Sequence, residues 1–235
     1  MNSWEDPRVA RGMTAQLAKR RERIAAGEKP LGWKVGFGGP ASKERMKLAD
    51  PLVGYLMQRG LVLSGSTVSF AGWKQPVAEC EIAVRMDRDL GGGATSDSAA
   101  AAVKEIFPAI ELADFDPVPT PDNIDTLLAN NVYQRHVVLA GITRPGAGLE
   151  GLTSRLIRRD AEAATTKEPD ALTGKLPDLI ALIANTLAAN GEKISAGDVI
   201  ITGSITPPIM LEKGEPGIGH ALDPIGQVSV NFTWD

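Results

Sequence analysis

Apolar and polar positions follow a helical rhythm in two long stretches of the chain. Apolar residues at helical spacing predict an amphipathic helix over residues 6–26, and Gly27 lies just beyond its end. Its apolar stripe consists of Val9, Met13, Leu17 and Ile24. The clearest helical pattern covers residues 176–191, LPDLIALIANTLAANG, where Gly191 is the expected C-terminal stop.

Three shorter helices are predicted between these two. The first covers residues 41–48. The second is capped by Ser96 or Asp97, runs through AAAAVKEIF and ends before Pro108. The third is TPDNIDTLLANN, residues 120–131.

Strands are predicted wherever short apolar runs rich in β-branched residues lie between turn signals. They cover residues 31–37, 51–56, 66–70, 77–86, 108–115, 135–142, 198–204 and 226–234. Strands outnumber helices and do not alternate regularly with them, which argues against a doubly wound parallel sheet. The pattern favours a β-rich α+β fold in a single domain over residues 1–235, with an N-terminal helical segment at about 5–27.

Composition and charge narrow the classes of protein that fit this pattern. The chain has 235 residues, of which 43% are hydrophobic, enough to build one sizeable core. A net charge of -4 offers no basic surface for nucleic acid, and no apolar run approaches the roughly 18–20 residues that span a membrane. Cys80 is the only cysteine, which excludes an intramolecular disulfide framework and a cysteine-rich zinc site. We therefore expect a cytoplasmic protein without nucleic-acid or membrane partners.

Two acids interrupt the predicted strand VAECEIAVRM at residues 77–86. Side chains alternate along a strand, so Glu79 and Glu81 point to the same face and Cys80 points to the opposite one. Burying two like charges side by side is unfavourable unless something compensates them. A bound cation would hold both carboxylates ionised, whereas Cys80 is expected to be a small core residue.

A third carboxylate, Glu111, interrupts the next predicted strand in the same way. Three carboxylates in apolar surroundings suit a hard divalent cation such as Mg²⁺ or Mn²⁺, with coordination positions left for water or a substrate. The alternative is that Glu79 and Glu81 lie on the solvent side of an edge strand and that Glu111 pairs with an arginine.

A lysine and two hydroxyls are further candidates. Lys34 interrupts the apolar run LGWKVGF, and is either a buried lysine that exchanges protons or a surface lysine lying beside Trp33. Thr202 and Ser204 end a predicted strand, where they can hold a carboxylate or simply cap a turn. The glycines of GFGG, residues 36–39, do not complete a dinucleotide-binding motif, and no P-loop pattern exists, so no nucleotide cofactor is expected.

Several of these stretches, taken in order, resemble a known family. The similarity is to the 2-keto-4-pentenoate hydratase and 4-oxalocrotonate decarboxylase family, within the fumarylacetoacetate hydrolase superfamily, and extends from about residue 4 to 233. The stretches that carry it are GWKVGF, PLVGYL, QPVAECEIAVRM, PAIELADF, VVLAGI, GDVIITGS and DPIGQVSVNF. The resemblance implies a mixed, rolled β-sandwich with flanking helices, commonly assembled as a homo-oligomer.

The resemblance also implies a function. It points to a metal-dependent lyase acting on small 2-hydroxy-dienoates or 2-oxo acids, first of all the hydration of 2-hydroxypenta-2,4-dienoate in the catabolism of aromatic compounds. The alternatives are decarboxylation of the 4-oxalocrotonate type, hydrolysis of the acylpyruvate type, and a non-catalytic protein that binds small acids. Some members of the family work as a complex, so a complex with a related pathway enzyme is one alternative to a simple homo-oligomer.

Residue roles follow from the same resemblance. Glu79, Glu81 and Glu111 would hold the divalent metal, Mg²⁺ or Mn²⁺, and Lys34 would be the catalytic lysine. The implied substrate-binding candidates are Asn131, Lys175, Thr202 and Ser204. Lys175 is a departure, because family hydratases usually carry a histidine where LTGKLPDL places this lysine. The departure bears on the substrate and leaves the metal ligands untouched.

Overall fold

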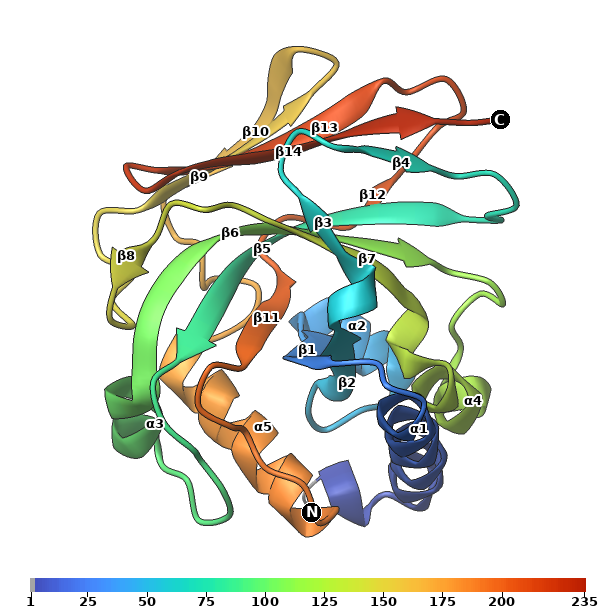
Figure 1. The fold of residues 1–235 in the computed structure, drawn as a ribbon, viewed down its shortest axis with the longest axis vertical. Coiled ribbons are helices and arrows are strands. Elements are labelled where there is room, and N and C mark those ends of the chain that lie inside the picture. Colours follow the sequence, from blue (N-terminus) through green and yellow to red (C-terminus); the bar gives the residue numbers. More distant parts are fainter. Residues whose placement is uncertain (1–2) are drawn as a thin grey trace.

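The computed structural model describes residues 3–235 and, within that range, contains five α-helices and two β-sheets (Figure 1). The helices are α1 (Pro7–Ala25), α2 (Pro40–Met46), α3 (Ser96–Ala102), α4 (Ile124–Ala129) and α5 (Leu176–Ala189). The large sheet consists of β1 (Pro30–Gly36), β2 (Leu52–Met57), β3 (Leu61–Leu63), β5 (Pro76–Met86), β6 (Val103–Asp114), β7 (Gln134–Leu139), β8 (Arg144–Pro145), β11 (Val199–Ser204) and β12 (Ile209–Met210). The small sheet consists of β4 (Thr67–Ser69), β9 (Thr153–Arg158), β10 (Ala161–Thr166), β13 (Gly217–Asp223) and β14 (Gly226–Thr233).

The small sheet lies across one side of the curled large sheet, and α1, α3, α4 and α5 lie on the opposite side of the molecule (Figure 1). The large sheet follows the order β2-β1-β11-β5-β6-β7-β3, with β12 paired to β5 and β8 paired to β6. It is mixed, because β1–β11 and β3–β7 are parallel pairs among antiparallel ones. The small sheet, in the order β10-β9-β13-β14-β4, contacts β6 through β13 and β14. The predicted β-rich α+β fold class is confirmed.

The two faces of the central strands β5 and β6 carry different side chains. One face, with Cys80, Ile82 and Ile110, packs into the main hydrophobic core. Because side chains alternate, the other face holds a second, smaller apolar cluster. That cluster consists of Leu31, Leu56, Ala83, Phe107, Ala109, Val137, Val199 and Ile201. Cys80 is fully buried, which confirms it as a core residue, and burial raises the pKa of its thiol.

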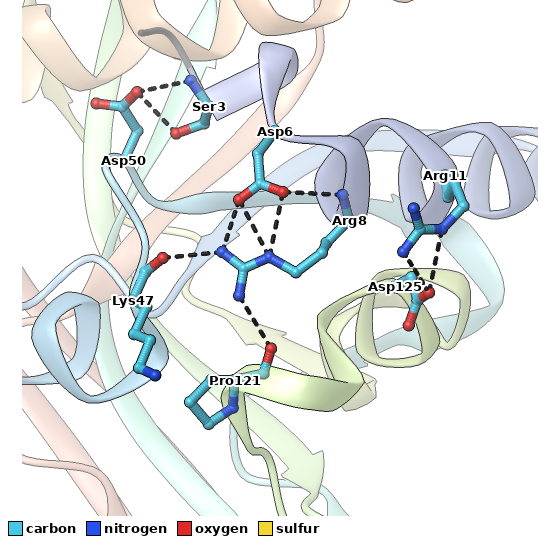
Figure 2. Close-up of polar contacts among 8 residues, drawn as sticks. All are labelled: Ser3, Asp6, Arg8, Arg11, Lys47, Asp50, Pro121 and Asp125. Carbon is cyan, nitrogen blue, oxygen red and sulfur yellow. Dashed lines mark hydrogen bonds and ion pairs between the residues drawn. The ribbon is translucent and has the colours of Figure 1, made fainter.

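Helix α1 begins where the sequence provides a cap. The Asp6 carboxylate accepts a hydrogen bond from the Arg8 amide at 2.8 Å, and Pro7 occupies the first turn. The Arg8 guanidinium donates to the carbonyl oxygens of Lys47 and Pro121, both at 3.0 Å (Figure 2). The start of α1 is thereby tied to the C-terminal end of α2.

The chain around the start of α1 makes two further polar contacts (Figure 2). The Ser3 amide and hydroxyl both donate to Asp50, at 3.1 and 2.7 Å, and Arg11 pairs with Asp125 at 3.2 Å. The contact with Asp50 fixes the loop that follows α2.

Most predicted elements occur within a few residues of their predicted bounds. In α1 the residues Val9, Met13 and Leu17 are buried as expected, but Ile24 is 36% exposed, so the packed stripe is shorter than predicted. Over residues 3–235, none of the helices has both the length and the apolar content needed to cross a membrane.

The helix predicted to run through AAAAVKEIF is wrong in its second half. Helix α3 ends at Ala102 and is capped by Thr95, and Val103 already begins strand β6. Cross-strand packing of β-branched and aromatic residues against β5 outweighs the local helical pattern, and Arg85 pairs with Glu105 opposite it at 2.9 Å.

Pro108 lies inside β6 instead of ending a helix. It is opposite Ile82 of β5. On its other edge, β6 pairs with β8 at residues 105–106 and with β7 from Ala109 onward. Pro108 therefore falls in the gap between these two partners, where no strand requires an amide donor.

His220 joins the two sheets. It is fully buried on β13, where its Nδ1 is 3.0 Å from the carbonyl oxygen of Ala109 on β6 and its Nε2 is 3.1 Å from the Ser154 hydroxyl on β9. A carbonyl oxygen only accepts, so Nδ1 carries the proton and Nε2 accepts from Ser154. Burial lowers the pKa of this imidazole to about 4, so His220 stays neutral at neutral pH.

This buried imidazole should make the fold sensitive to acid. The pKa of His220 is lower in the folded than in the unfolded chain, so the unfolded chain takes up a proton first as the pH falls from 6.5 toward 4. Over that window His220 should cost about 3 kcal/mol of stability. Urea unfolding at several pH values should show the stability difference between wild type and H220Q shrinking as pH falls. H136Q, which removes a partly buried histidine, is the control and should retain most of the acid sensitivity. A difference that stays constant with pH would contradict this assignment.

Candidate functional site

Glu79, Glu81 and Glu111 lie together on one face of the large sheet. Glu79 on β5 is directly opposite Glu111 on β6, and Glu81 is opposite Ala109. Carboxylate oxygens from the three residues all lie within 4.8 Å of one another. Glu81 and Glu111 are fully buried, and β5 lies between β11 and β6. The alternative that these acids lie on the solvent side of an edge strand is therefore wrong.

Lys34 reaches the same cluster from a distant strand. Its Nζ donates a hydrogen bond to Glu111 Oε1 at 2.6 Å, and its side chain is 2% exposed. In a flat sheet β1 and β6, separated by β11 and β5, would lie about 14 Å apart, and side chains project away from a sheet, not along it. The contact therefore depends on the curl of the large sheet (Figure 1). The alternatives of a surface lysine and of an arginine paired with Glu111 are both wrong.

The cluster has an imbalance of charge. Three carboxylates face one ammonium group, which leaves two negative charges when all four groups are ionised. Burial, and then the charge of Glu111, raises the pKa of Glu79 to about 7, and burial together with the neighbouring acids raises the pKa of Glu81 well above its usual range. Burial by itself would lower the pKa of Lys34, but the three carboxylates outweigh it and raise that pKa.

The oxygen atoms that remain available suit a hard divalent cation. Glu81 Oε2 accepts a hydrogen bond from the Gly203 amide at 2.6 Å. Glu81 Oε1 and Glu111 Oε2 are buried and have no hydrogen-bond partner among residues 3–235. Native proteins seldom leave such atoms unsatisfied, and carboxylate oxygens are the ligands that Mg²⁺ and Mn²⁺ prefer. The three glutamates therefore fit a divalent metal both in donor type and in charge.

A cavity of about 210 Å³, here called the proximal cavity, lies beside Glu79. Its walls are residues 35–42, residues 172–173 and the segment from Gly203 to Pro208 without Ile205. Its volume suits a ligand of only a few carbon atoms. The cavity thus gives a small organic acid access to Glu79.

Ser204 and Thr206 supply two of the hydroxyl groups in this wall. The hydroxyl oxygens of both are buried, and neither has a hydrogen-bond partner in the part of the chain that the structure describes. Ser204 is also paired with Glu81 across β11 and β5. These hydroxyls can donate to a carboxylate or a keto oxygen held in the cavity.

The structure does not bring the other predicted substrate-binding residues to the proximal cavity. The Thr202 hydroxyl donates to the Ile82 carbonyl at 2.9 Å, because Thr202 and Ser204 are separated by a glycine of positive φ at a break in the strand register. Lys175 is exposed at the N-cap of α5 and lies outside the cavity wall. Asn131 is buried, but its amide group is already used, since it hydrogen-bonds the backbone of Tyr55 in both directions at 2.8 Å.

Asn131 starts an unusual left-handed turn. Asn131, Val132 and Tyr133 have φ angles of 56°, 52° and 62°, a region that costs non-glycine residues roughly 1–2 kcal/mol each. The turn places the Val132 side chain against Gly36, where an added Cβ would lie 2.7 Å from Val132 Cγ1. Val132, Lys34 and Glu79 line one small chamber of about 40 Å³. Here the strained backbone shapes the wall beside the lysine.

Two residues near the cluster carry no signal in the sequence that predicts a role. Ser42 lines the proximal cavity, and Arg45 lines the small chamber that also contains Lys34 and Glu79. Both come from α2, a short helix whose sequence reads as an ordinary polar surface segment. Only the three-dimensional position of α2 brings them to the acids.

A family model described as "Fumarylacetoacetate (FAA) hydrolase C-terminal" matches residues 34–229, which include all four members of the charged cluster. The chain belongs to the fumarylacetoacetate hydrolase family. The fold that the sequence resemblance implies is therefore confirmed.

Within this family the chain is similar to both hydratases and decarboxylases. It is 27% identical over 223 residues to 2-hydroxyhexa-2,4-dienoate hydratase of Comamonas testosteroni, covering 91% of this chain and 82% of that protein. It is 28% identical over 236 residues to 4-oxalocrotonate decarboxylase of Pseudomonas putida, covering 98% and 88%. A solved structure of 4-oxalocrotonate decarboxylase from Pseudomonas putida G7, complexed with magnesium and adipate, superposes with a TM-score of 0.86 at 26% identity, covering 96% and 86%. The predicted resemblance to these two groups of enzymes is confirmed.

Replacing one buried acid should separate fold stability from metal binding. In E81Q the repulsion among the acids falls while the hydrogen bond from Gly203 can be kept, so the metal-free variant should unfold at the same temperature as wild type or higher. Its affinity for Mn²⁺, measured by calorimetric titration, should fall at least about tenfold, which is about 1.4 kcal/mol. The matched control is E105Q, which removes an acid on the neighbouring strand β6 that pairs with Arg85 of β5. Unchanged Mn²⁺ affinity in E81Q would exclude Glu81 as a ligand.

Proposed function

We propose that this protein is a metal-dependent lyase acting on short 2-hydroxy-dienoic or 2-oxo acids, with hydration of 2-hydroxypenta-2,4-dienoate or a close relative as its leading reaction. The observation that carries the proposal is the cluster of the buried Glu81 and Glu111, the half-buried Glu79 and Lys34 beside a cavity of about 210 Å³. Its relatives include a hydratase of a 2-hydroxy-dienoate, which supports this reaction type. Glu79, Glu81 and Glu111 would hold the divalent metal, Mg²⁺ or Mn²⁺.

The metal, when bound, would attract the carboxylate and 2-oxygen of the substrate and stabilise negative charge on that oxygen. Its positive charge would also offset the carboxylates that raise the pKa of Lys34, so that the amine could release and accept a proton. Ser204 and Thr206 would donate hydrogen bonds to the bound acid and fix its orientation.

Lys34 would move the protons of the reaction. Ketonisation of the dienol removes the proton from its 2-hydroxyl and adds one to the terminal carbon, which yields an unsaturated 2-oxo acid. Water then adds across the remaining double bond. The ammonium group lies beside Glu111 in the wall of the chamber that contains Glu79, a position from which proton transfer to a bound chain is feasible.

Decarboxylation is the second candidate. The observation that favours it is the similarity in sequence and structure to 4-oxalocrotonate decarboxylase over nearly the whole chain. The same stabilised 2-oxygen would accept the electrons released with CO₂, so the charged cluster serves either reaction. Hydrolysis of the acylpyruvate type ranks third, and a non-catalytic acid-binding protein fourth.

Turnover of a freshly generated dienol tests the proposal directly. With Mg²⁺ or Mn²⁺, the protein should remove the absorbance of 2-hydroxypenta-2,4-dienoate or of its six-carbon homologue, and chelation of the metal should abolish the activity. Parallel reactions with 4-oxalocrotonate should be followed by CO₂ release, which distinguishes a decarboxylase. The absence of turnover on this panel by metal-loaded protein would favour the acid-binding alternative.

Lys34 can be tested apart from the metal. K34M keeps the length of the side chain but cannot carry a proton, so turnover should fall at least about 100-fold. Its Mn²⁺ affinity should be unchanged or higher, because a positive charge next to the ligands is removed. K104M, which alters an exposed lysine of β6, is the control, and thermal unfolding with Mn²⁺ checks that both variants fold. Turnover of K34M at the wild-type rate would remove Lys34 from the mechanism.

A further inference from the structure

The side chain of Asn131 joins two strands from near opposite ends of the large sheet. Its Nδ2 donates to the carbonyl oxygen of Tyr55 on β2, and its Oδ1 accepts from the amide of the same residue, both at 2.8 Å. Asn131 lies three residues before β7, which is separated from β2 by four strands in the sheet order. In a flat sheet β2 and β7 would lie about 24 Å apart. The carboxamide therefore ties together two parts of the sheet that only its curl brings close (Figure 1).

The carboxamide of Asn131 takes the place of a neighbouring strand. Over residues 3–235 the only strand paired with β2 is β1, so the outer side of β2 lacks a strand partner. A backbone amide and carbonyl that are buried without partners are costly. The carboxamide offers a donor and an acceptor side by side, as a peptide group does, and it satisfies both groups of Tyr55.

Both the backbone and the side chain explain why this residue is an asparagine. Its φ of 56° is a left-handed value that asparagine and aspartate tolerate better than most other non-glycine residues. An ionised aspartate has no donor for the carbonyl of Tyr55, and a glutamine is one carbon longer. Asparagine alone among these residues meets both requirements.

Lys34 passes directly beside this contact. It is opposite Gly54 in the pairing of β1 with β2. A Cβ added at Gly54 would lie 2.9 Å from Lys34 Cγ and 3.1 Å from Asn131 Oδ1. The aliphatic stem of the lysine and the carboxamide oxygen therefore border the same small space, which the absence of a side chain at Gly54 leaves open.

The next residue of the turn contacts the strand that carries the lysine. Val132 packs against Gly36, which lies two residues after Lys34 on β1. On its other side the turn continues into β7, where Val137 is directly opposite Glu111 of β6. The turn therefore connects the strand of the lysine to the strand of its carboxylate partner by the short route, across the open side of the curl.

We propose that Asn131 is a positioning residue for Lys34: its carboxamide holds β2, and with it β1, against the start of β7, which keeps the lysine within reach of Glu111 and of a bound acid. The inference rests on the proposed function, because it assigns the proton transfer to Lys34. Asn131 would thus serve the reaction without touching the substrate, which agrees with the full use of its amide group by Tyr55.

Removal of the carboxamide with the turn left intact tests this role. Glycine accepts a positive φ, so N131G deletes both hydrogen bonds without adding backbone strain. Its kcat on 2-hydroxypenta-2,4-dienoate should fall at least about tenfold, because a misplacement of about 1 Å in a reacting group can cost about 100-fold in rate. Its KM and its Mn²⁺ affinity should stay within about twofold of wild type, since Asn131 lines neither the proximal cavity nor the small chamber.

Asn185 provides a matched control. Its carboxamide makes the same pair of bonds to one residue, accepting from the Ala94 amide at 3.1 Å and donating to the Ala94 carbonyl at 3.0 Å. Neither Asn185 nor Ala94 lines the proximal cavity or the small chamber. N185A, in which alanine suits the helical backbone of α5, should lose stability but keep the kcat of wild type. N131S keeps one hydrogen-bonding group and should lose less turnover than N131G.

Two further measurements separate positioning from a general weakening of the fold. If Asn131 acts through Lys34, adding N131G to K34M should change the residual turnover by no more than about twofold. Metal-free crystal structures of wild type and N131G need no turnover at all. Lys34 Nζ, which is 2.6 Å from Glu111 Oε1, should move beyond about 3.5 Å in N131G and so lose this hydrogen bond.

The outcomes distinguish this inference from the proposed function. A kcat of N131G equal to that of N185A overturns the role of Asn131, as does an unmoved Lys34 in the N131G structure, and either result leaves the proposed function standing. A loss of Mn²⁺ affinity of about tenfold or more would mean that Asn131 supports the metal ligands, which also overturns the inference. Absence of turnover by metal-loaded wild type overturns the proposed function, and the two crystal structures then decide alone whether Asn131 positions Lys34.

Discussion

The crowding of three carboxylates, two of them fully buried and one half-buried, against a single ammonium group is the constraint on which this structure depends. Glu79 and Glu111 face one another across two central strands, and Lys34 arrives from the far side of the curl. Such a group is unstable by its own electrostatics, because burial and mutual repulsion both favour protonation of the acids. It persists because the strands that carry it have no freedom to move apart. Each is flanked by hydrogen-bonded partners, and the apolar cluster on the same face excludes water from beneath the acids. The fold thus holds a cluster that a cation of charge two would balance.

The site is divided between a rigid floor and a rim of loops. The floor consists of interior strands, on which Glu81, Glu111 and Lys34 are almost completely buried and Glu79 is half-buried. The rim consists of α2, the segment after β11, the left-handed turn before β7 and the loops that carry Phe37 and Phe115, and it contributes hydroxyls, aromatic rings and Arg45. Under the proposed function, the floor would carry out the chemistry that depends on exact charge placement, and the rim would recognise the remainder of the substrate.

The sequence predicts the floor better than the rim, for a physical reason. An acid or a lysine inside an apolar strand is unfavourable enough to stand out, so VAECEIAVRM, PAIELADF and LGWKVGF identify Glu79, Glu81, Glu111 and Lys34 directly. Strands β9, β10 and β13 are not among the predicted elements, because their apolar residues are few and they are stabilised by pairing with one another. Strand pairing also explains residues 103–107, which form part of β6 by pairing with β5 although their sequence pattern is helical. Family resemblance predicts Asn131 and Thr202 as substrate-binding residues, yet in the structure their side chains hydrogen-bond to backbone groups. Arg45 becomes visible only when α2 is placed beside strands from elsewhere in the chain.

The left-handed turn at residues 131–133 has a consequence for how this chain can diverge. At position 132 the backbone angle favours glycine, whereas the chamber beside Lys34 is given its shape by the isopropyl group of Val132. The two preferences cannot both be met by one amino acid. Substitutions that relax the main chain would widen the chamber, and substitutions that preserve its width keep the strain. Few residues can therefore replace Val132 without cost, and the same holds for Gly36, where an added Cβ would lie 2.7 Å from Val132 Cγ1.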